Sequence, residues 1–345
     1  MRSALLVVSL ALVAVPGAFA RDASTTLTVE QQVGQLIVMS FRGTTAPAYV
    51  LEALHEKRAA GVILFGGNIA SAEQLRALSG SIRRQGGRPL VAVDQEGGRV
   101  RRVPWVGPVR AQPGQAAAGT VRSDAATAAR QLHALGITVT FAPVADVPSV
   151  RGSAVRSRAF SRDPAIVSAS VRASVRGWRS GGIAPAAKHF PGIGGAAAST
   201  DDAVVRITRS RAELERVDLV PFRAAIGAGV PLVMVGHGRY SALDRFRIAS
   251  QSEPIIDGLL RGELGFGGVV VTDSLEARAS LATGSLEKVA ERAVRAGADL
   301  VLLTGRGSYQ PVYDHLLAVA KSDPAFRARV RDSAARVLAL KASVG

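Results

Sequence analysis

The chain has 345 residues, no cysteine and a formal net charge of +16 at pH 7. Without cysteine it can form no disulfide and use no thiolate as nucleophile or ligand. The positive charge would suit nucleic acid, but 38 of the 43 basic residues are arginines scattered along the chain, and only 5% of residues are aromatic. Base-stacking surfaces and long basic runs are therefore scarce, and we expect no nucleic-acid partner.

The first 20 residues have the pattern of a secretory signal peptide. Arg2 precedes an apolar stretch over residues 4–15, and small residues around Ala20 form a cleavage site. The stretch is shorter than the roughly 20 residues that span a bilayer, and no later segment lacks charge over that length. We expect export to the periplasmic, cell-wall or extracellular space without a transmembrane anchor, leaving residues 21–345 as the mature chain.

Short apolar runs rich in β-branched residues alternate with stretches of helical periodicity, which indicates parallel strands joined by helices. Eight such runs are expected to be strands: Leu36–Ser40, Gly61–Phe65, Pro89–Val93, Ile137–Ala142, Ile183–Ala187, Leu232–Val235, Gly268–Thr272 and Asp299–Leu303. The expected helices include Ser71–Arg84, Ser123–Leu135, Pro164–Ser180, Arg209–Ala228, Ser252–Glu263, Ser285–Ala296 and Pro324–Lys341. Ser71 and Gln74 are spaced as a capping box for the first of these.

Eight strand–helix units predict closure into a single-domain (β/α)₈ TIM-type barrel, a fold of about 250 residues plus extensions. The alternative is an open doubly wound sheet, since Gly192–Ala197 matches a loose dinucleotide fingerprint. That match lacks the tight strand-to-helix turn which the fingerprint needs, and Pro191 precedes it.

Chemically useful side chains stand where three of the runs end. Asp94 follows the third run, Lys188 and His189 follow the fifth, and Asp273 follows the seventh. In a barrel these carboxyl ends meet on one face, where catalytic residues lie. The glycine-rich segment after His189 would let a ligand approach the backbone closely.

Carboxyl pairs at such a site suggest glycoside cleavage, because retaining glycosidases use one carboxylate as nucleophile and a second carboxyl as acid/base about 5–5.5 Å away. Asp273 could be the nucleophile, and Asp201 or Asp202 could supply the second group. Helix capping is the alternative for both of the latter. Likewise, Asp94 and its neighbouring arginines could bind sugar or simply stabilise their own loop, and Arg158 could simply be a solvated surface arginine.

A metal site is not expected. The five histidines include no pair at the spacing of helical metal ligands, and no thiolate is present to complete a ligand set.

Several ordered segments then resemble glycoside hydrolase family 3, and within it the single-domain bacterial β-N-acetylhexosaminidases of cell-wall turnover. They are Gly61–Phe65 with Asn68, Asp94–Arg99, Phe141–Val147, Arg158–Phe160, Lys188–Gly192, His237 with Tyr240, and Val271–Leu275. The resemblance implies a (β/α)₈ barrel, a retaining mechanism and no cofactor.

The resemblance also implies residue roles. It makes Asp273 the nucleophile, and it places Asp94, Arg102, Arg158, Lys188 and His189 in the first sugar subsite. One loop departs from the pattern: Ile193 replaces a histidine, and Ser199-Thr200-Asp201 stands where the relatives have Asp-Ser-His, whose histidine is the acid/base. Asp201 is then the positional candidate for acid/base, provided that its pKa is raised.

Three functions follow from these observations. We expect a retaining β-glycosidase acting on N-acetylglucosaminides from peptidoglycan, with a carbohydrate substrate and a monomeric chain. The alternatives are a glycan-binding barrel with weakened catalysis and a β-glucosidase-like enzyme. The last is less favoured because those relatives usually carry a second domain.

Overall fold

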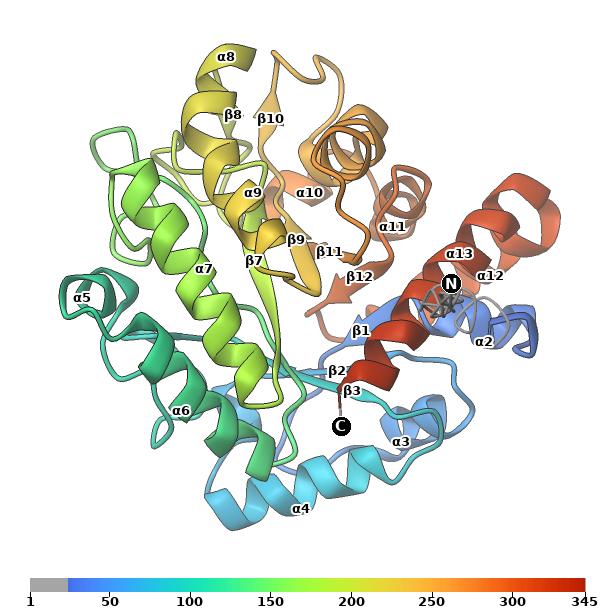
Figure 1. The fold of residues 1–345 in the computed structure, drawn as a ribbon. Helices are drawn as coiled ribbons and strands as arrows, with labels where there is room; N and C mark the ends of the chain where they lie inside the picture. Colours follow the sequence, from blue (N-terminus) through green and yellow to red (C-terminus); the bar gives the residue numbers. More distant parts are fainter. Residues whose placement is uncertain (1–23, 345) are drawn as a thin grey trace, which may run out of the picture.

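A computed structural model describes residues 24–344, and its centre is a closed barrel of eight parallel strands (Figure 1). The barrel strands are β1 (Ile37–Met39), β2 (Gly61–Leu64), β3 (Leu90–Val93), β6 (Val139–Thr140), β7 (Ala184–Phe190), β9 (Leu232–Val235), β11 (Val269–Ser274) and β12 (Leu300–Leu303). β1 pairs with both β2 and β12, which closes the ring. The predicted barrel is confirmed and the open sheet is wrong. The predicted signal peptide lies outside the described residues.

Helices surround the strands in Figure 1. They are α2 (Val29–Gly34), α3 (Ala48–His55), α4 (Ala72–Arg83), α5 (Gln112–Ala117), α6 (Val121–Ala134), α7 (Pro164–Ser180), α8 (Arg211–Glu213), α9 (Leu219–Gly227), α10 (Arg278–Leu281), α11 (Leu286–Arg295), α12 (Tyr309–Ser322) and α13 (Pro324–Ser343), with π-helical turns over Leu214–Asp218 and Pro254–Glu263. None of the helices in the described chain has both the length and the apolarity that a membrane crossing requires.

Two of the local expectations need correction. Ser71 caps α4 by accepting the Gln74 N–H, but the Gln74 side chain accepts from Ala70 instead of Ser71, so only half of the predicted capping box forms. α12 was not among the expected helices. Pro311 interrupts its pattern, yet it stands in the first turn, where proline removes no helical hydrogen bond.

The apolar residues form two layers, one between the strands and the helices and one inside the barrel. The inner layer includes Leu90, Val269 and Leu300, which are the first residues of β3, β11 and β12. It also includes Val337 and Leu340 of α13. α13 therefore covers the amino ends of the strands. The site must lie at the opposite, carboxyl ends.

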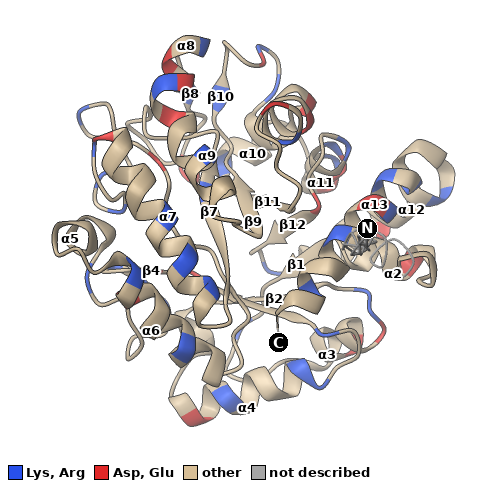
Figure 2. Cartoon of the chain, viewed as in Figure 1, with Lys and Arg blue, Asp and Glu red and all other residues tan. Residues whose placement is uncertain are grey.

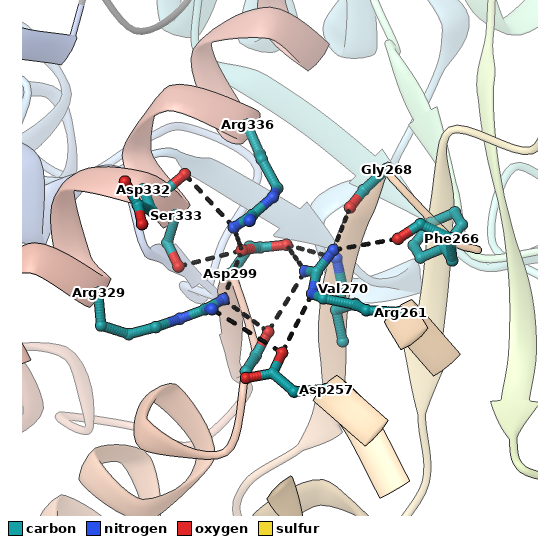
Figure 3. Close-up of polar contacts among 11 residues, drawn as sticks. Asp257, Arg261, Phe266, Gly268, Val270, Asp299, Arg329, Asp332, Ser333 and Arg336 are labelled. Carbon is teal, nitrogen blue, oxygen red and sulfur yellow. Dashed lines mark hydrogen bonds and ion pairs between the residues drawn. The ribbon is translucent and has the colours of Figure 1, made fainter. Parts of the chain in front are cut away.

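A buried carboxylate fastens α13 to the end of the barrel where the strands begin (Figure 3). The fully buried Asp299, just before β12, pairs with Arg261 at 2.5 Å, Arg329 at 3.1 Å and Arg336 at 3.0 Å, and it accepts the Val270 N–H at 2.9 Å. Part of the arginine surplus is thus structural. The remaining basic residues are spread over many helices (Figure 2).

Candidate active site

A pocket of about 410 Å³ opens at the carboxyl ends of the strands. Its lining includes all seven residues that the sequence singled out: Asp94, Arg102, Arg158, Lys188, His189, Asp201 and Asp273. They come from five separate segments of the chain, so the barrel is what brings them together. Their chemical roles remain predictions. Phe65, Phe141 and Met234 also line the pocket and were not predicted.

Two of the barrel strands run further than their apolar runs indicated. β7 continues through Lys188 and His189 to Phe190, and β11 continues through Asp273 to Ser274. The pairing register shifts at these ends, between Lys188 and Phe190 and between Val271 and Ser274. Irregularities of this kind disrupt the pairing locally and redirect side chains, and they are frequent next to active sites.

Lys188 is the centre of an ion-pair cluster in the pocket floor. Its Nζ lies 2.7 Å from Asp94 Oδ1 and 2.8 Å from Glu96 Oε1, and its side chain is 3% exposed. Arg158 makes a bidentate pair with Glu96, with its Nε and Nη2 at 2.9 and 2.6 Å from the two oxygens. Burial would lower the pKa of Lys188, but Asp94 and Glu96 outweigh it and raise that pKa, so the ammonium stays charged.

Glu96 is a site residue that the sequence analysis did not select, although it lies in the quoted segment after Asp94. Burial alone would raise its pKa, but Lys188 and Arg158 hold it at about 2. Glu96 is thus a fixed negative charge that positions two cations. The signal for Glu96 in the sequence was its place two residues after the strand-end Asp94. The sequence alone does not show whether a side chain at that place faces the pocket.

The second carboxylate oxygen of Asp94, Oδ2, makes only a longer contact at the pocket. Arg102 Nη2 lies 3.6 Å from Asp94 Oδ2, and the Arg102 guanidinium lies 5.5 Å from the centre of the Phe65 ring. The proposed loop-stabilising pair thus exists but is long. Both groups still face the pocket, so they can exchange this contact for hydrogen bonds to a ligand.

His189 is oriented by a carboxylate that was not predicted as a site residue. Its Nδ1 lies 2.7 Å from Asp146 Oδ2, and Asp146 is fully buried. Asp146 also accepts the Ile193 N–H at 2.8 Å. A carboxylate accepts only, so Nδ1 carries a proton, and Nε2 is left for the pocket.

His237 supports the end of β11 from the neighbouring strand loop. Its Nδ1 is 2.8 Å from Ser250 Oγ, and its Nε2 is 2.8 Å from the Ser274 carbonyl oxygen. The Ser274 N–H in turn donates to Asp273 Oδ1 at 2.8 Å. Burial would raise the pKa of Asp273, but His189, His237 and Lys188 outweigh it and hold that pKa below its ordinary value. Asp273 is therefore ionised, as a nucleophilic carboxylate must be.

Asp201 reaches the same pocket from the loop between β7 and α8. The Arg278 N–H donates to the Asp201 carbonyl at 3.1 Å, and the Ala279 N–H donates to the Thr200 carbonyl at 3.1 Å, so the loop is fastened beside the end of β11. Asp201 is exposed as a residue, but partial desolvation of its carboxyl at the pocket and the nearby Asp273 charge raise its pKa. The capping interpretation is wrong, because the N-cap of α8 is Ser210, and the exposed Asp202 is not part of the pocket lining.

The glycines after His189 serve packing within the protein. A Cβ on Gly194 would lie 1.9 Å from the Val147 carbonyl oxygen, and one on Gly192, whose φ is +122°, would lie 2.8 Å from Asp218 Cβ. The space that these glycines open is taken by the chain itself. The expectation that they admit a ligand is therefore wrong.

The barrel agrees with the comparisons with known proteins. Residues 28–340 match the model of the glycosyl hydrolase family 3 N-terminal domain. The chain belongs to glycosyl hydrolase family 3. This family 3 chain is 38% identical over 280 residues to a β-hexosaminidase of Stenotrophomonas maltophilia, which covers 78% of this chain and 83% of that protein. It is also 38% identical over 292 residues to a β-hexosaminidase of Alkalilimnicola ehrlichii, covering 81% and 84%.

Two solved structures superpose closely on this one. A β-N-acetylglucosaminidase from Paenibacillus gives a TM-score of 0.88 at 35% identity, with 92% of this chain and 62% of that chain covered. A β-N-acetylhexosaminidase from Beutenbergia cavernae gives 0.84 at 33% identity, with 92% and 99% covered. The prediction of a glycoside hydrolase of the β-N-acetylhexosaminidase type is confirmed by these matches.

Proposed function

We propose that this family 3 protein is an exported, retaining β-N-acetylhexosaminidase that releases N-acetylglucosamine from peptidoglycan fragments or related glycans. The observation that carries the proposal is the pair of carboxyl groups in one pocket with opposite pKa shifts. Asp273 is held ionised and Asp201 is held towards its protonated form. Two carboxyl groups that differ in this way suit a nucleophile and an acid.

In this mechanism, Asp94, Lys188, Arg102 and Arg158 hold the hydroxyl groups of the terminal sugar. Asp273 attacks the anomeric carbon, and Asp201 gives its proton to the departing glycosidic oxygen, so that a covalent glycosyl-enzyme and a free alcohol form. Asp201, now ionised, takes a proton from water as that water attacks the anomeric carbon. Asp273 leaves as a carboxylate, and the two inversions give net retention.

N-acetylglucosamine as the substrate sugar rests on the relatives, whose names describe β-hexosaminidases and β-N-acetylglucosaminidases. The peptidoglycan source and the export rest on the signal-like residues 1–20 and on the resemblance. Secretion is tested by N-terminal sequencing of the protein from the culture medium or periplasm, which should begin at Arg21.

A second candidate is a glycan-binding barrel with weak catalysis. It is favoured by one feature of the sequence: Ser199-Thr200-Asp201 stands where the family pattern that the chain resembles implies an Asp-Ser-His with the acid/base histidine. A β-glucosidase-like activity is the third candidate. Release of the aryl group from aryl β-N-acetylglucosaminide and from aryl β-glucoside separates all three, since each predicts activity on one, on the other or on neither.

Asp273→Asn tests the mechanism directly. The amide has nearly the same shape but cannot form the glycosyl ester, so we expect activity on the aryl N-acetylglucosaminide to fall by at least about 10³-fold with an unchanged circular dichroism spectrum. Asp202→Asn, an exposed carboxyl in the nearby loop, is the control. Parental activity in Asp273→Asn would overturn the nucleophile assignment, and a product of inverted configuration would overturn the retaining mechanism.

A further inference from the structure

Three neighbouring helices on the outer wall of the barrel carry eight exposed arginines. α4 and α6 both line an open hollow of about 470 Å³, and α6 packs along α7. Figure 2 shows basic segments along all three helices. We call the surface formed by these arginines the basic face, and its members are Arg76, Arg83, Arg84, Arg122, Arg130, Arg172, Arg176 and Arg179.

The basic face has almost no negative charge to balance it. Residues 72–84 together with α6 and α7 contain eight arginines and two carboxylates, Glu73 and Asp124, so their net charge is +6. This is more than a third of the +16 of the whole chain. In the described part of the chain, none of the eight arginines forms an ion pair. By contrast, the exposed Arg295 on α11 pairs with two carboxylates.

The hollow between α4 and the end of α6 concentrates this positive charge. Arg76, Arg83, Arg84 and His133 line it, and its lining includes no carboxylate. Packed helices lie about 8–10 Å apart, which is close to the Debye length of about 8 Å at physiological salt. The potentials of arginines on neighbouring helices therefore add, and an anionic group in the hollow meets three guanidinium groups without a competing carboxylate.

The chemistry of the basic face favours a flexible chain of phosphate groups as its partner. The charges are spread along three helices, so a single small anion can meet only a few of them. The only Phe, Tyr or Trp of these helices, Trp178, is 1% exposed, so the face offers no ring on which nucleic acid bases could stack. Ile166 is their one exposed large apolar side chain, which leaves little to insert into a lipid layer.

Much of the basic face lies away from the candidate active site. α4, α6 and α7 end just before β3, β6 and β7 begin, so their last turns lie at the amino ends of the strands. Arg83, Arg130 and Arg179 are near these ends, whereas the pocket with Asp273 lies at the carboxyl ends. A polymer bound to the basic face therefore leaves the pocket open to substrate.

We propose that the basic face is a docking surface for a flexible anionic polymer with phosphodiester charges, which holds the protein while its pocket stays open. The arginines pair with successive phosphates, and counterions of the polymer are released. That such a polymer is met at the cell surface rests on the export proposed above. Binding by the basic face depends on neither export nor glycoside cleavage.

The experiment measures Kd for fluorescently labelled poly(glycerol phosphate) by anisotropy at several salt concentrations. In the parent, eight phosphate contacts should make the affinity fall about 10³-fold between roughly 50 and 200 mM salt. Arg122→Gln/Arg172→Gln/Arg176→Gln removes three side chains that make no hydrogen bond in the described structure. We expect this variant to raise Kd at least about 10-fold at low salt and to reduce the salt slope of log Kd by about 2.

Arg245→Gln/Arg247→Gln/Arg331→Gln is the matched control, because it removes the same charge from exposed positions outside the basic face. Its Kd should stay within about twofold of the parent, since these charges lie on other elements and are screened by salt. Equal losses in the two triple variants would overturn the proposal, because net charge would then set the binding. No binding by the parent at low salt would overturn it as well.

Two competitors test the choice of partner. They are a DNA duplex and vesicles of phosphatidylglycerol and phosphatidylcholine, each compared at the same concentration of phosphate. Tighter binding of the parent to either one would overturn the flexible polymer as the occupant. Saturating polymer should leave kcat/KM on an aryl N-acetylglucosaminide unchanged, and inhibition would overturn the placement away from the pocket. If the parent hydrolyses no glycoside, the binding measurements still decide the proposal, and only the proposed function has failed.

Discussion

The two carboxyl groups of the pocket differ because their surroundings differ. Asp273 stands on a strand, receives the Ser274 N–H and lies near three groups that favour its charge. Asp201 stands on a loop, keeps a long contact of 3.3 Å with Ser199 Oγ and faces the Asp273 charge. Environment alone thus divides one residue type into two roles.

Asp201→Ala should separate substrates by their leaving groups. Proton donation matters most for a poor leaving group, so we expect a large loss on a disaccharide and a small one on a dinitrophenyl glycoside. Breakdown of the covalent intermediate should then be slow, and added azide should accelerate turnover because it attacks without a base. The readouts are kcat/KM for each substrate and the azide product.

The pH profile gives a second measure of Asp201. Because its pKa is raised, its acid form persists to higher pH than in an ordinary aspartate, and activity should fall as pH rises through that pKa. In Asp201→Ala, this decrease of activity with rising pH should disappear. The control is Asp202→Ala. If Asp202→Ala instead showed the selective loss and the azide response, the acid would be the neighbouring residue; if neither did, the loop would carry no acid.

Glu96→Gln should destabilise the protein as well as impair binding. The change leaves the buried Lys188 and the partly exposed Arg158 with less counter-charge, and breaking a buried pair costs about 3 kcal/mol. The folded-state pKa of Glu96 is depressed to about 2 from 4.5, so its stabilisation is present above pH 4.5 and is lost as pH falls towards 2. Urea unfolding at pH 7 and at pH 3 measures the difference between the two proteins, which should shrink at the lower pH.

The exposed pair of Glu52 with Arg58 supplies the control for this prediction. Glu52 is 63% exposed, so Glu52→Gln should change the free energy of unfolding by less than about 1 kcal/mol. An equally small effect in Glu96→Gln would mean that Glu96 does not hold the cluster together.

At the scale of elements, the segment between β7 and α8 decides where Asp201 stands. Tyr240 donates its hydroxyl to the Gly192 carbonyl at 2.8 Å, and Arg209 pairs with the buried Asp218 at 2.8 Å. The other Asp218 oxygen is buried without a hydrogen-bond partner in the described structure. Both ends of the loop are thus held by hydrogen bonds or ion pairs to the rest of the barrel. One of these contacts uses Asp218, a buried carboxylate with one oxygen that lacks a hydrogen-bond partner.

Asp218 should make stability depend on pH. Burial raises its pKa to about 7 although Arg209 opposes the shift. The folded state therefore binds this proton more tightly than the unfolded state, and the free energy of unfolding should fall as pH rises from about 4 to about 7. Asp218→Asn should flatten this decline, measured as Tm against pH. Asp332→Asn, at an exposed position on α13, should leave the decline unchanged, and a decline that persists in Asp218→Asn would assign it to another group.

At the scale of the whole molecule, α13 packs near the start of the described chain and covers the amino ends of the barrel strands. It contacts α2, α11 and α12, it inserts Val337 and Leu340 into the barrel interior, and Lys341 donates to Gln35 Oε1 at 2.6 Å. Lys341 is buried, and burial with the nearby Lys57 lowers its pKa to about 7. The buried Lys341 of α13 therefore lowers the free energy of unfolding at neutral pH.

Lys341→Met should stabilise the protein. The folded-state pKa of Lys341 lies below its unfolded value of 10.5, so the parent gains stability as pH rises from about 7 to 10.5. The Met variant should unfold at least 2–4 °C higher at pH 6.5, roughly the shift for 1 kcal/mol, and its advantage should shrink by pH 10. Lys288→Met, at a side chain 62% exposed, should show neither effect. A lower Tm in Lys341→Met at pH 6.5 would mean that the bond to Gln35 outweighs the cost of burial.

Local pattern in the sequence was enough for the eight barrel strands, most helices and the strand-end residues Asp94, Lys188, His189 and Asp273. The resemblance to the family was needed to select Arg102, Arg158 and Asp201. An apolar run rich in β-branched residues records burial on both faces, and parallel strands leave their carboxyl ends on one face, so the residues after each run must meet there. Asp273 and Lys188 could be selected on this ground before any contact was known.

Only the tertiary structure decided which groups touch. Asp146 orients His189 from 43 positions away, and Lys188 meets Asp94 from 94 positions away; such partners are set by barrel closure and leave no periodic signal. The basic face likewise arises because barrel closure places α4, α6 and α7 side by side. The sequence by itself determined which side chains stand at the strand ends, because that depends on local burial. The tertiary structure decided their charges and partners, because electrostatic energy depends on distance through space and not on separation along the chain.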